Sequence, residues 1–400
     1  MSLLPVDHAI AAILRRVPTP VSEQVGLSDA LGRVLTTLIV AAHDQPPFPA
    51  SAMDGYAIRA ADVVEGHQLK LIGVSQAGAG FTVPVGAGEA VRIFTGAPVP
   101  EGADTVIMQE EAVVADGMVR FTAPARLGHS VRARGMDFAR GQTLVAAGTR
   151  LNPLHLTVAA AANVAQLTVS RRPSIALLAT GDELVLPGAP LGADQIIASN
   201  SYGLQPLLSP YACEVVDHGI ARDNHADLSA KLGAILAQEP DILVTTGGAS
   251  VGDHDIVQDI LIEHGVTLDF WRINMRPGKP LMFGVRGKTL VFGLPGNPVS
   301  AMVTAMVFIR PALRHWLDYS EPPKCFLPLA GPTPANTGRR HFMRAQVVQT
   351  TSGPQALPIT QTDSGHTSSL AQADALIVQP ENDVGQPAGS IVEVVLIDRF

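Results

Sequence analysis

Two glycine-rich turns decide the fold: ILVTTGGASVGDHD at residues 242–255 and TLVFGLPGNPVS at residues 289–300. In each, an apolar run typical of a buried strand leads through glycines directly into a helical pattern, which begins near Ile256 in the first and at Pro298 in the second. This order is how an α/β sheet forms an anion-binding site at its carboxyl edge. We therefore expect a phosphate or another oxyanion to bind here.

The loop between the two turns, residues 272–279, carries three cations, Arg272, Arg276 and Lys279. The chain as a whole has a formal net charge of −8, which argues against a general nucleic-acid binder because such a protein needs a broad basic face. An anionic ligand must then be met by local cations. This loop is the best candidate to supply them.

The segments around the turns predict a multidomain α/β protein. Strand-like runs at 175–179, 242–246, 281–284 and 289–293 alternate with helical patterns at 227–238, 256–264 and 298–317, so we expect a doubly wound, mostly parallel sheet over 173–318. Four hundred residues exceed what one core usually supports. We place the other domains as follows: a discontinuous, mixed helical and β domain at 1–47 plus 141–172, a mainly β domain at 48–140, and a C-terminal β barrel-like domain at 319–400.

Shorter elements are expected in these flanking domains. Apolar spacing predicts one amphipathic helix from Val6 to Leu14 and a second from Leu27 to Leu35. A further helix is predicted at 154–162, and strands at 166–169, 342–348 and 391–397.

The chain is expected to be a soluble protein of a reducing cytoplasm. Pro5 and Asp7 interrupt the stretch where a secretory signal would need its apolar core, and the longest apolar stretches, 156–169 and 300–309, are too short or too polar to span a bilayer. Cys213 and Cys325 lie far apart, so no disulfide framework or thiolate metal site is supported.

The second turn has the plainest mechanism. Asn297 is expected to cap a helix whose first position, Pro298, needs no backbone donor, and Gly293 and Gly296 let the backbone approach a ligand closely. The free amides and the helix dipole then favour an anion. The alternative is a tight strand-to-helix connection with no ligand.

The first turn allows two interpretations. Residues 248–252 match the G-x-S-x-G pattern of a hydrolase with Ser250 as nucleophile, with Asp269, His315 and His341 downstream as partners. However, Asp253, His254 and Asp255 form a polar loop where that pattern requires a helix. We favour a loop in which Ser250 and the glycine amides hold phosphate while Asp253 or Asp255 reaches a metal.

Acidic residues recur in turns after other strand-like runs, at Asp54, Asp137, Asp182, Glu183 and Asp223. Taken singly, each is more often a turn former or a helix cap. Together they suit Mg²⁺, which prefers one or two carboxylates plus substrate phosphates and water. The sequence therefore predicts a metal-dependent phosphate site.

Several motifs in register carry a resemblance to a known family. They are PASAMDGYA at 49–57, FTGAPVP at 94–100, TGDEL at 180–184, TGGASVG at 246–252, PGKP at 277–280 and GLPGNPVS at 293–300. With them the chain resembles the molybdopterin molybdenumtransferases, the MoeA-type proteins, which are related to gephyrin-type E domains. The resemblance covers essentially the whole chain.

The resemblance implies a homodimer of four-domain subunits, with the sheet domain binding the pterin and the partner's β domain lending residues to the cleft. The implied reaction takes adenylylated molybdopterin and molybdate, uses Mg²⁺, and yields molybdenum cofactor and AMP. Contact with other molybdenum cofactor proteins is possible, and neither nucleic acid nor membrane is expected as a partner.

The resemblance also implies roles for individual residues. Asp54 and Thr95 resemble the contribution of the dimer partner. An acidic set for catalysis comprises Asp137, Glu183, Asp223 and Asp255, and of these Asp137, Glu183 and Asp255 would hold the metal. Pterin-phosphate contacts would come from Gly247, Gly248, Ser250, Asn297, Pro298 and Ser300. The molybdate and phosphate contacts would come from Arg276 and Lys279, with Arg344 or Arg339 and Ser368 or Ser369.

Two positions depart from the family pattern: Arg276 stands where many relatives have lysine, and Met136 stands where a glutamate commonly precedes the aspartate. Two alternative functions belong to the same resemblance. A molybdopterin adenylyltransferase would attach AMP instead of releasing it, but such enzymes are usually built from the sheet domain alone. A non-catalytic scaffold would need the extra domains and long linker of gephyrin, which this chain lacks.

Overall fold

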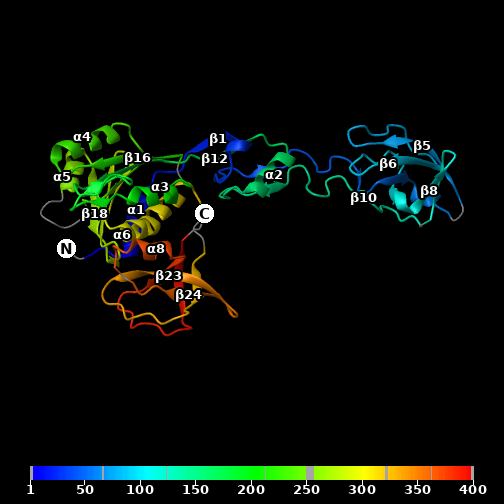
Figure 1. Cartoon of the computed structure of the whole chain (residues 1–400). Helices are drawn as coiled ribbons and strands as arrows, with labels where there is room; N and C mark the ends of the chain where they lie inside the picture. Colours follow the sequence, from blue (N-terminus) through cyan, green and yellow to red (C-terminus); the bar gives the residue numbers. More distant parts are fainter. Residues whose placement is uncertain are drawn as a thin grey trace. The chain divides into compact units, whose positions relative to one another are not determined.

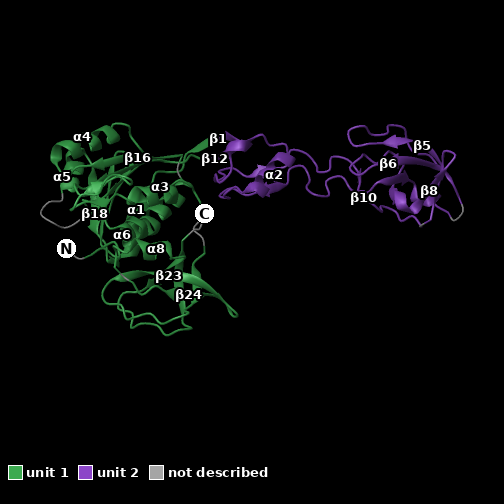
Figure 2. Ribbon diagram, viewed as in Figure 1, with its two compact units in different colours: residues 1–23, 170–400 green, residues 24–169 purple. Residues whose placement is uncertain are grey.

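The computed structural model describes residues 3–64, 67–122, 124–211, 213–248, 256–319, 323–361 and 363–397. The chain divides into two compact units, one made of residues 1–23 and 170–400 and the other of residues 24–169 (Figure 2). The predicted division into four domains is finer than this one, and it remains a prediction. The elements are labelled in Figure 1.

The first unit is built on a six-stranded sheet of order β16-β13-β17-β21-β20-β18. Four neighbouring strands pair in parallel: β16 (Glu214–Ala221), β13 (Ser174–Thr180), β17 (Ile242–Thr246) and β21 (Thr289–Leu294). Strand β20 (Pro280–Arg286) pairs antiparallel with β21, and edge strand β18 (Thr267–Arg272) pairs antiparallel with β20. The chain passes from β13 to β16 on one side and then returns to β17 on the other. Such a reversal opens a crevice at the carboxyl ends of β13 and β17.

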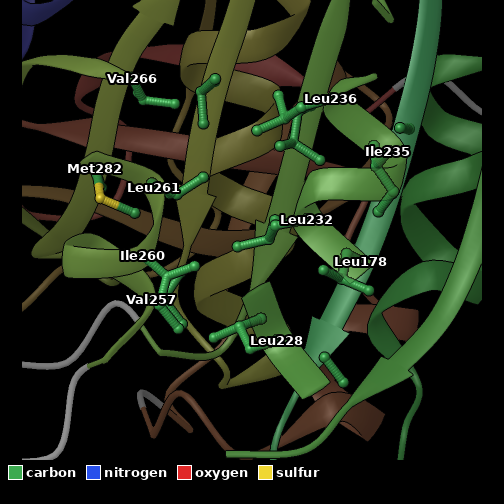
Figure 3. Close-up of a cluster of buried hydrophobic side chains, with 14 residues drawn as sticks. Leu178, Leu228, Leu232, Ile235, Leu236, Val257, Ile260, Leu261, Val266 and Met282 are labelled. Carbon is green, nitrogen blue, oxygen red and sulfur yellow. The ribbon is translucent and has the colours of Figure 1, made fainter. Parts of the chain in front are cut away.

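Helices cover both faces of this sheet, so the predicted doubly wound arrangement is confirmed. On one face, α4 (His225–Leu236) and α5 (Ile256–Glu263) pack their leucines, isoleucines and valines against side chains such as Leu178 and Met282 (Figure 3). Alternate residues of the same strands point to the other face. There α3 (Asn200–Leu208) and α6 (Pro298–Thr304) pack.

The predicted helix at 298–317 is confirmed as one run. It begins as α6, continues as a π-helical segment over Ala305–Ile309, and ends as α7 (Arg310–Trp316). Helix α3 was not predicted, because Pro206 lies inside it and Gly203 lies one turn earlier. Among the described residues, no helix combines the length and apolar character needed to cross a bilayer.

A second sheet in this unit has the order β19-β23-β25-β26-β22, with β24 paired to β23. Its strands are β19 (Met275–Arg276), β22 (Cys325–Pro328), β23 (Arg340–Thr350), β24 (Gly353–Pro358), β25 (Ala375–Gln379) and β26 (Ile391–Leu396), and helix α8 spans Thr367–Ala371. Strand β19 belongs by sequence to the loop between β18 and β20. Its pairing with β23 therefore brings the predicted cationic loop onto the C-terminal sheet.

The N-terminal helix α1 (Val6–Arg16) confirms the first predicted amphipathic helix, and it packs on α7. Both of its ends carry a bidentate ion pair. Asp7 accepts from the guanidinium of Arg340 at 2.7 and 2.9 Å, and Arg16 donates to both carboxylate oxygens of Asp269 at 2.8 and 2.7 Å. These contacts explain why residues 1–23 group with 170–400.

The second unit contains a six-stranded sheet of order β7-β4-β6-β5-β9-β8. The strands are β4 (Gly55–Ile58), β5 (Leu69–Ser75), β6 (Glu89–Ile93), β7 (Thr105–Met108), β8 (Ala112–Ala115) and β9 (Met118–Phe121). Short pairs complete the described strands: β1 (Ser22–Gly26) with β12 (Gln166–Ser170), β2 (Ile39–Val40) with β11 (Thr143–Val145), β3 (Ala50–Ser51) with β10 (Val131–Arg132), and, in the first unit, β14 (Leu184–Val185) with β15 (Ile196–Ile197). Helix α2 spans Pro153–Ala161, as expected.

The second predicted amphipathic helix, from Leu27 to Leu35, is wrong. Only Leu27–Asp29 forms one 3-10 turn, and the following backbone pairs with residues 149–151 instead. The amide of Leu35 donates to the carbonyl of Thr149 at 3.0 Å, and the amide of Gly32, whose φ is +71°, donates to that of Leu151 at 2.9 Å. Long-range pairing therefore overrides the local leucine spacing.

Gly55 is required by the packing of strand β4 between β6 and β7. A Cβ atom at this position would lie 1.9 Å from the carbonyl oxygen of Ile107. That oxygen belongs to the backbone of a paired strand, so it cannot turn away. The strand register and the loop before it, which carries Asp54, therefore depend on glycine here.

Replacing Gly55 with alanine should destabilise the β domain by about 3 kcal/mol, as expected for overpacking against a rigid neighbour. In the full-length protein, hydrogen exchange measured by mass spectrometry should be markedly faster over 55–58 and 105–108. Val113→Ala, at an exposed position of the same sheet, is the matched control and should leave the exchange unchanged. Equal protection in both variants would contradict the constraint.

Candidate functional site

The carboxyl ends of β13, β17 and β21 meet at one edge of the first sheet. The amide of Gly247 donates to the carbonyl of Leu294 at 3.2 Å, so the turn after β17 is fastened to the end of β21. Gly247 has a φ of +90°, and a Cβ atom on it would lie 2.4 Å from the carbonyl oxygen of Thr180. Only glycine allows these turns to approach each other so closely.

Three carboxylates lie beside this edge, on Asp182, Glu183 and Asp223. The amide of Asp223 donates to the carboxylate of Asp182 at 3.2 Å, and Arg222 donates to the carbonyl of Asp182 at 3.1 Å. Burial, together with the negative charges of Glu183 and Asp182, raises the pKa of Asp223. A cation bound among them would relieve this repulsion.

The carboxylate oxygens of this acidic group suit a hard divalent cation, although they do not supply a complete set of metal ligands. Within the described ranges, no three His, Cys, Asp or Glu side chains are arranged to hold a metal ion by themselves. Mg²⁺ usually takes only one or two carboxylates and completes its shell with water and substrate phosphates. Asp255 and Ser250, predicted for the metal and the phosphate, lie outside the described residues.

A group of cationic side chains lies where strand β19 pairs with strand β23. Arg276 stands in register with His341, and burial together with the nearby charge of Arg339 lowers the pKa of Arg276. The Nε atom of Arg276 is buried and has no hydrogen-bond partner among the described residues. The loop continues through Gly278, which lies against Thr304 of helix α6, to the half-buried Lys279. An anion would relieve the repulsion between the two guanidinium groups.

His341 is buried within this cationic group. Burial lowers its pKa to about 4, and the charges of Arg276, Arg344 and Arg339 act in the same direction. The Nδ1 atom lies 3.3 Å from the side-chain oxygen of Gln379, which requires the proton to be on Nδ1. His341 is therefore neutral at neutral pH and adds no charge to the site.

In this structure Asp269 is not available as the acidic member of a hydrolase triad. Both carboxylate oxygens of Asp269 are bound by Arg16, and Asp269 lies on edge strand β18. His341 lies among guanidinium groups on the other sheet. Asp269 is therefore committed to holding α1.

Hydrogen bonds distinguish the alternatives predicted for the C-terminal domain. Arg344 is buried and donates to three backbone carbonyls, those of Gln361, Asp363 and His366. Ser369 is also buried, and its hydroxyl donates to the carbonyl of His366 at 2.7 Å. Both residues therefore hold the backbone at Gln361, Asp363 and His366 in place, whereas the side chains of Arg339 and Ser368 make no hydrogen bond within the described chain.

Asn297 occupies the N-cap position of helix α6, and its carbonyl accepts from the amide of Ala301 at 2.9 Å, but its side chain makes no capping hydrogen bond, so the predicted side-chain cap is wrong. Pro298 occupies the first helical position as expected, but the Asn297 amide donates to the hydroxyl of Ser364 at 2.9 Å instead. Ser300 is buried in the first turn, where its carbonyl accepts from Thr304. The side chain of Asn297 thus links the turn after β21 to the C-terminal loop that contains Ser364.

Asn200, at the start of α3, is a residue of this edge that the sequence reasoning missed. Its side-chain amide donates to the carbonyl of Gly296 at 2.8 Å. A polar residue directly before an apolar helical run could have indicated this position. It fixes the direction of the peptide that precedes Asn297.

In the second unit, the motifs that contain Asp54 and Thr95 lie together. One carboxylate oxygen of Asp54 accepts from the amide of Thr95 at 2.7 Å and from its hydroxyl at 2.8 Å, and these bonds lower the pKa of Asp54. Arg92, which donates to the carbonyl of Gly55 at 3.0 Å, lowers it further. Asp54 is therefore a fixed, ionised carboxylate.

Asp137 lies in a separate loop of the second unit, and no contact in the described chain joins it to Asp54. Its amide donates to the carbonyl of Gln45, but its exposed carboxylate has no described partner. The loop is held by Asp44, which accepts from Arg134 at 2.6 Å and from the amide of Arg140 at 2.8 Å. Asp44 was not predicted, because its role depends entirely on this long-range contact.

Comparisons with known proteins agree with this arrangement. Family models match in chain order: the MoeA N-terminal region (domain I and II) over residues 4–163, a probable molybdopterin binding domain over 176–315, and the MoeA C-terminal region (domain IV) over 327–397. The molybdopterin molybdenumtransferase of Bacillus subtilis is 32% identical, covering 98% of this chain and 94% of the relative. The chain belongs to the molybdopterin molybdenumtransferase (MoeA) family.

Two further matches extend this result. The molybdopterin molybdenumtransferase of Haemophilus influenzae is 36% identical over 78% of this chain and 77% of its own length. The solved structure of the molybdopterin biosynthesis MoeA protein from Pyrococcus horikoshii is 30% identical, with a TM-score of 0.84 and full coverage of both chains. The multidomain MoeA fold is thereby confirmed, and the adenylyltransferase, hydrolase and scaffold alternatives are not favoured.

Replacing His341 with glutamine should remove one pH-dependent contribution to the stability of this MoeA chain. Because the folded pKa of about 4 lies below the ordinary value of 6.5, the unfolded chain takes up the proton more readily as the pH falls. Stability from this group is complete above pH 6.5 and declines toward pH 4. In that window the wild type should lose roughly 1 kcal/mol per pH unit relative to His341→Gln.

Urea unfolding followed by the fluorescence of Trp271 and Trp316, both in the first unit, measures this difference. The gap between wild type and variant should change across the window and stay constant above it. A constant gap at every pH would show that His341 does not titrate as its surroundings require.

Proposed function

We propose that this chain transfers molybdenum from molybdate to adenylylated molybdopterin and releases AMP. Membership of the MoeA family gives it a role in molybdenum cofactor biosynthesis as an enzyme of the molybdenumtransferase type. One observation carries the finer statement: an acidic group and a cationic group, neither neutralised by the other, flank glycine turns at one sheet edge. This is the arrangement that a nucleotide, a divalent cation and an oxyanion together would need.

The cationic side is proposed to bind molybdate and phosphate. Molybdate is a tetrahedral dianion, so its binding needs cations that converge from more than one segment. Arg276 and Lys279 come from the segment between β18 and β20, and Arg339 directly precedes β23. We assign Arg344 and Ser369 to holding the backbone at Gln361, Asp363 and His366, and we keep Arg339 and Ser368 as ligand-binding residues.

The turn side is proposed to bind the pterin and its phosphate. Gly247 and Gly248 present backbone at the end of β17, and Asn297, Pro298 and Ser300 lie in the turn and first helical residues after β21. Backbone amides in such turns hold phosphate without requiring a charged side chain. Binding both halves of the substrate here would place its dithiolene beside the molybdate.

The acidic side is proposed to hold Mg²⁺, through Glu183 and Asp223 with Asp255 and Asp137 as further candidates. When bound, Mg²⁺ would offset negative charge on the phosphoanhydride as AMP leaves. The feature of this chain that fits the ion is the partly buried Asp223 beside Glu183 and Asp182, whose pKa is raised by burial and by these neighbouring charges. A cytoplasmic location and contacts with other molybdenum cofactor proteins remain predictions.

Substituting Glu183→Gln or Asp223→Asn should lower the turnover number for AMP release by about a hundredfold or more, because each removes a carboxylate aimed at the metal and the leaving phosphate. The measurement is AMP release from adenylylated molybdopterin with molybdate, as a function of Mg²⁺ concentration. Glu263→Gln replaces an exposed carboxylate on α5 of the same unit and should retain full activity. Undiminished release in both site variants would remove these residues from the mechanism.

A homodimer whose partner supplies Asp54 and Thr95 is the second part of the proposal. It predicts complementation between Asp54→Asn and Glu183→Gln subunits, each inactive alone. After the two proteins are mixed and the subunits exchange, each heterodimer would contain one intact site. Activity should return to about a quarter of wild type. No recovery in a mixture shown to contain heterodimers would mean that Asp54 acts within its own subunit, and full activity of Asp54→Asn alone would mean that Asp54 has no role in the reaction.

A further inference from the structure

We propose that the hydroxyl of Ser364 is a further binding group for the tetrahedral oxyanion, and that Asn297 positions it. The inference rests on the proposed function and names a residue to which no role in it has been given. It is carried by the hydrogen bond that joins these two side chains, one from the turn after β21 and one from the C-terminal domain.

The direction of this hydrogen bond leaves the Ser364 proton free. The Asn297 side-chain nitrogen can only donate, so Ser364 Oγ accepts at 2.9 Å. A hydroxyl that accepts one bond can still donate its own hydrogen. Among the described residues, no acceptor takes that hydrogen, whereas the hydroxyl of Ser369, in the following helix α8, donates to the carbonyl of His366.

The backbone around Ser364 is fixed before any ligand binds. Arg344 donates to the carbonyls of Asp363 at 3.1 Å and of His366 at 3.4 Å, on either side of Ser364. The Asp363 carboxylate accepts from the amide of Gly365 at 2.7 Å. Little conformational entropy is then lost when the hydroxyl meets an anion, which is the advantage of a preorganised donor.

The same hydrogen bond places Ser364 on the cationic side of the site. Asn297 directly precedes α6, and Gly278 of the cationic loop lies against Ser300 and Thr304 of that helix. Lys279 follows Gly278, and Arg344 acts on His341 together with Arg276. The guanidinium and ammonium groups supply charge, and an oriented hydroxyl supplies a directed donor that a tetrahedral oxyanion can use.

The test compares Ser364→Ala, Ser364→Thr, Asn297→Ala and the double alanine variant in the full-length enzyme. AMP release is measured against molybdate concentration and, separately, against adenylylated molybdopterin concentration. Ser364→Ala should raise the KM for molybdate about tenfold, as for the loss of one hydrogen bond to a charged ligand, with the KM for the pterin nucleotide little changed. Ser364→Thr keeps the hydroxyl and should restore most of the molybdate affinity.

The double variant separates positioning from independent binding. If Asn297 acts on molybdate through Ser364, the molybdate KM of the double variant should be no higher than that of the worse single variant. Ser352→Ala, in an exposed turn of the same C-terminal sheet, should behave as wild type. An unchanged molybdate KM in Ser364→Ala, a change confined to the pterin nucleotide, or additive effects would overturn the inference. Absence of molybdate-dependent AMP release in the wild type would instead overturn the proposed function itself.

Discussion

Like charges held close together are the constraint on which the first unit depends. The pKa of Asp223 is raised because the side chain is partly buried and because Glu183 and Asp182 lie beside it. Arg276 meets the charge of Arg339 in half-buried surroundings, and the one titratable group at their centre, His341, stays neutral. A fold selected only for stability would pair these charges. Here the acidic and the cationic groups are kept apart at one sheet edge, where we propose that the anions and a cation bind.

Backbone geometry is what makes the arrangement possible. Glycines at 247 and 278 let the turns lie against Thr180 and Thr304 with no room for a side chain. The two residues of β19 leave the first sheet to pair with β23, and this brings Arg276 beside a residue of the C-terminal domain. The site is therefore assembled by segments far apart in sequence, and main-chain contacts bring these segments together.

The sheet domain could be predicted because its strands and helices alternate clearly and its glycine turns follow the strands directly. The same reasoning failed at Leu27–Leu35, where the backbone pairs with residues 149–151, and at Asn297, whose side-chain amide binds Ser364 and makes no capping hydrogen bond. The sequence does not show whether Arg339 or Arg344 is the one that binds a ligand. Only the structure shows that the guanidinium of Arg344 already donates to backbone carbonyls. Asp44 and Asn200 were missed for a related reason: each acts on a loop that is remote in the chain.

The crossing of β19 onto the C-terminal sheet limits how such proteins can be recombined. A boundary drawn between the sheet domain and residues 319–400 looks natural in sequence, yet Met275 and Arg276 lie on its far side and form part of the second sheet. If the C-terminal segment were exchanged for that of a distant homologue, β19 would have to pair with a β23 strand of different sequence. The sequences of β19 and of the C-terminal segment are thus coupled, and a functional chimera would need both from the same protein.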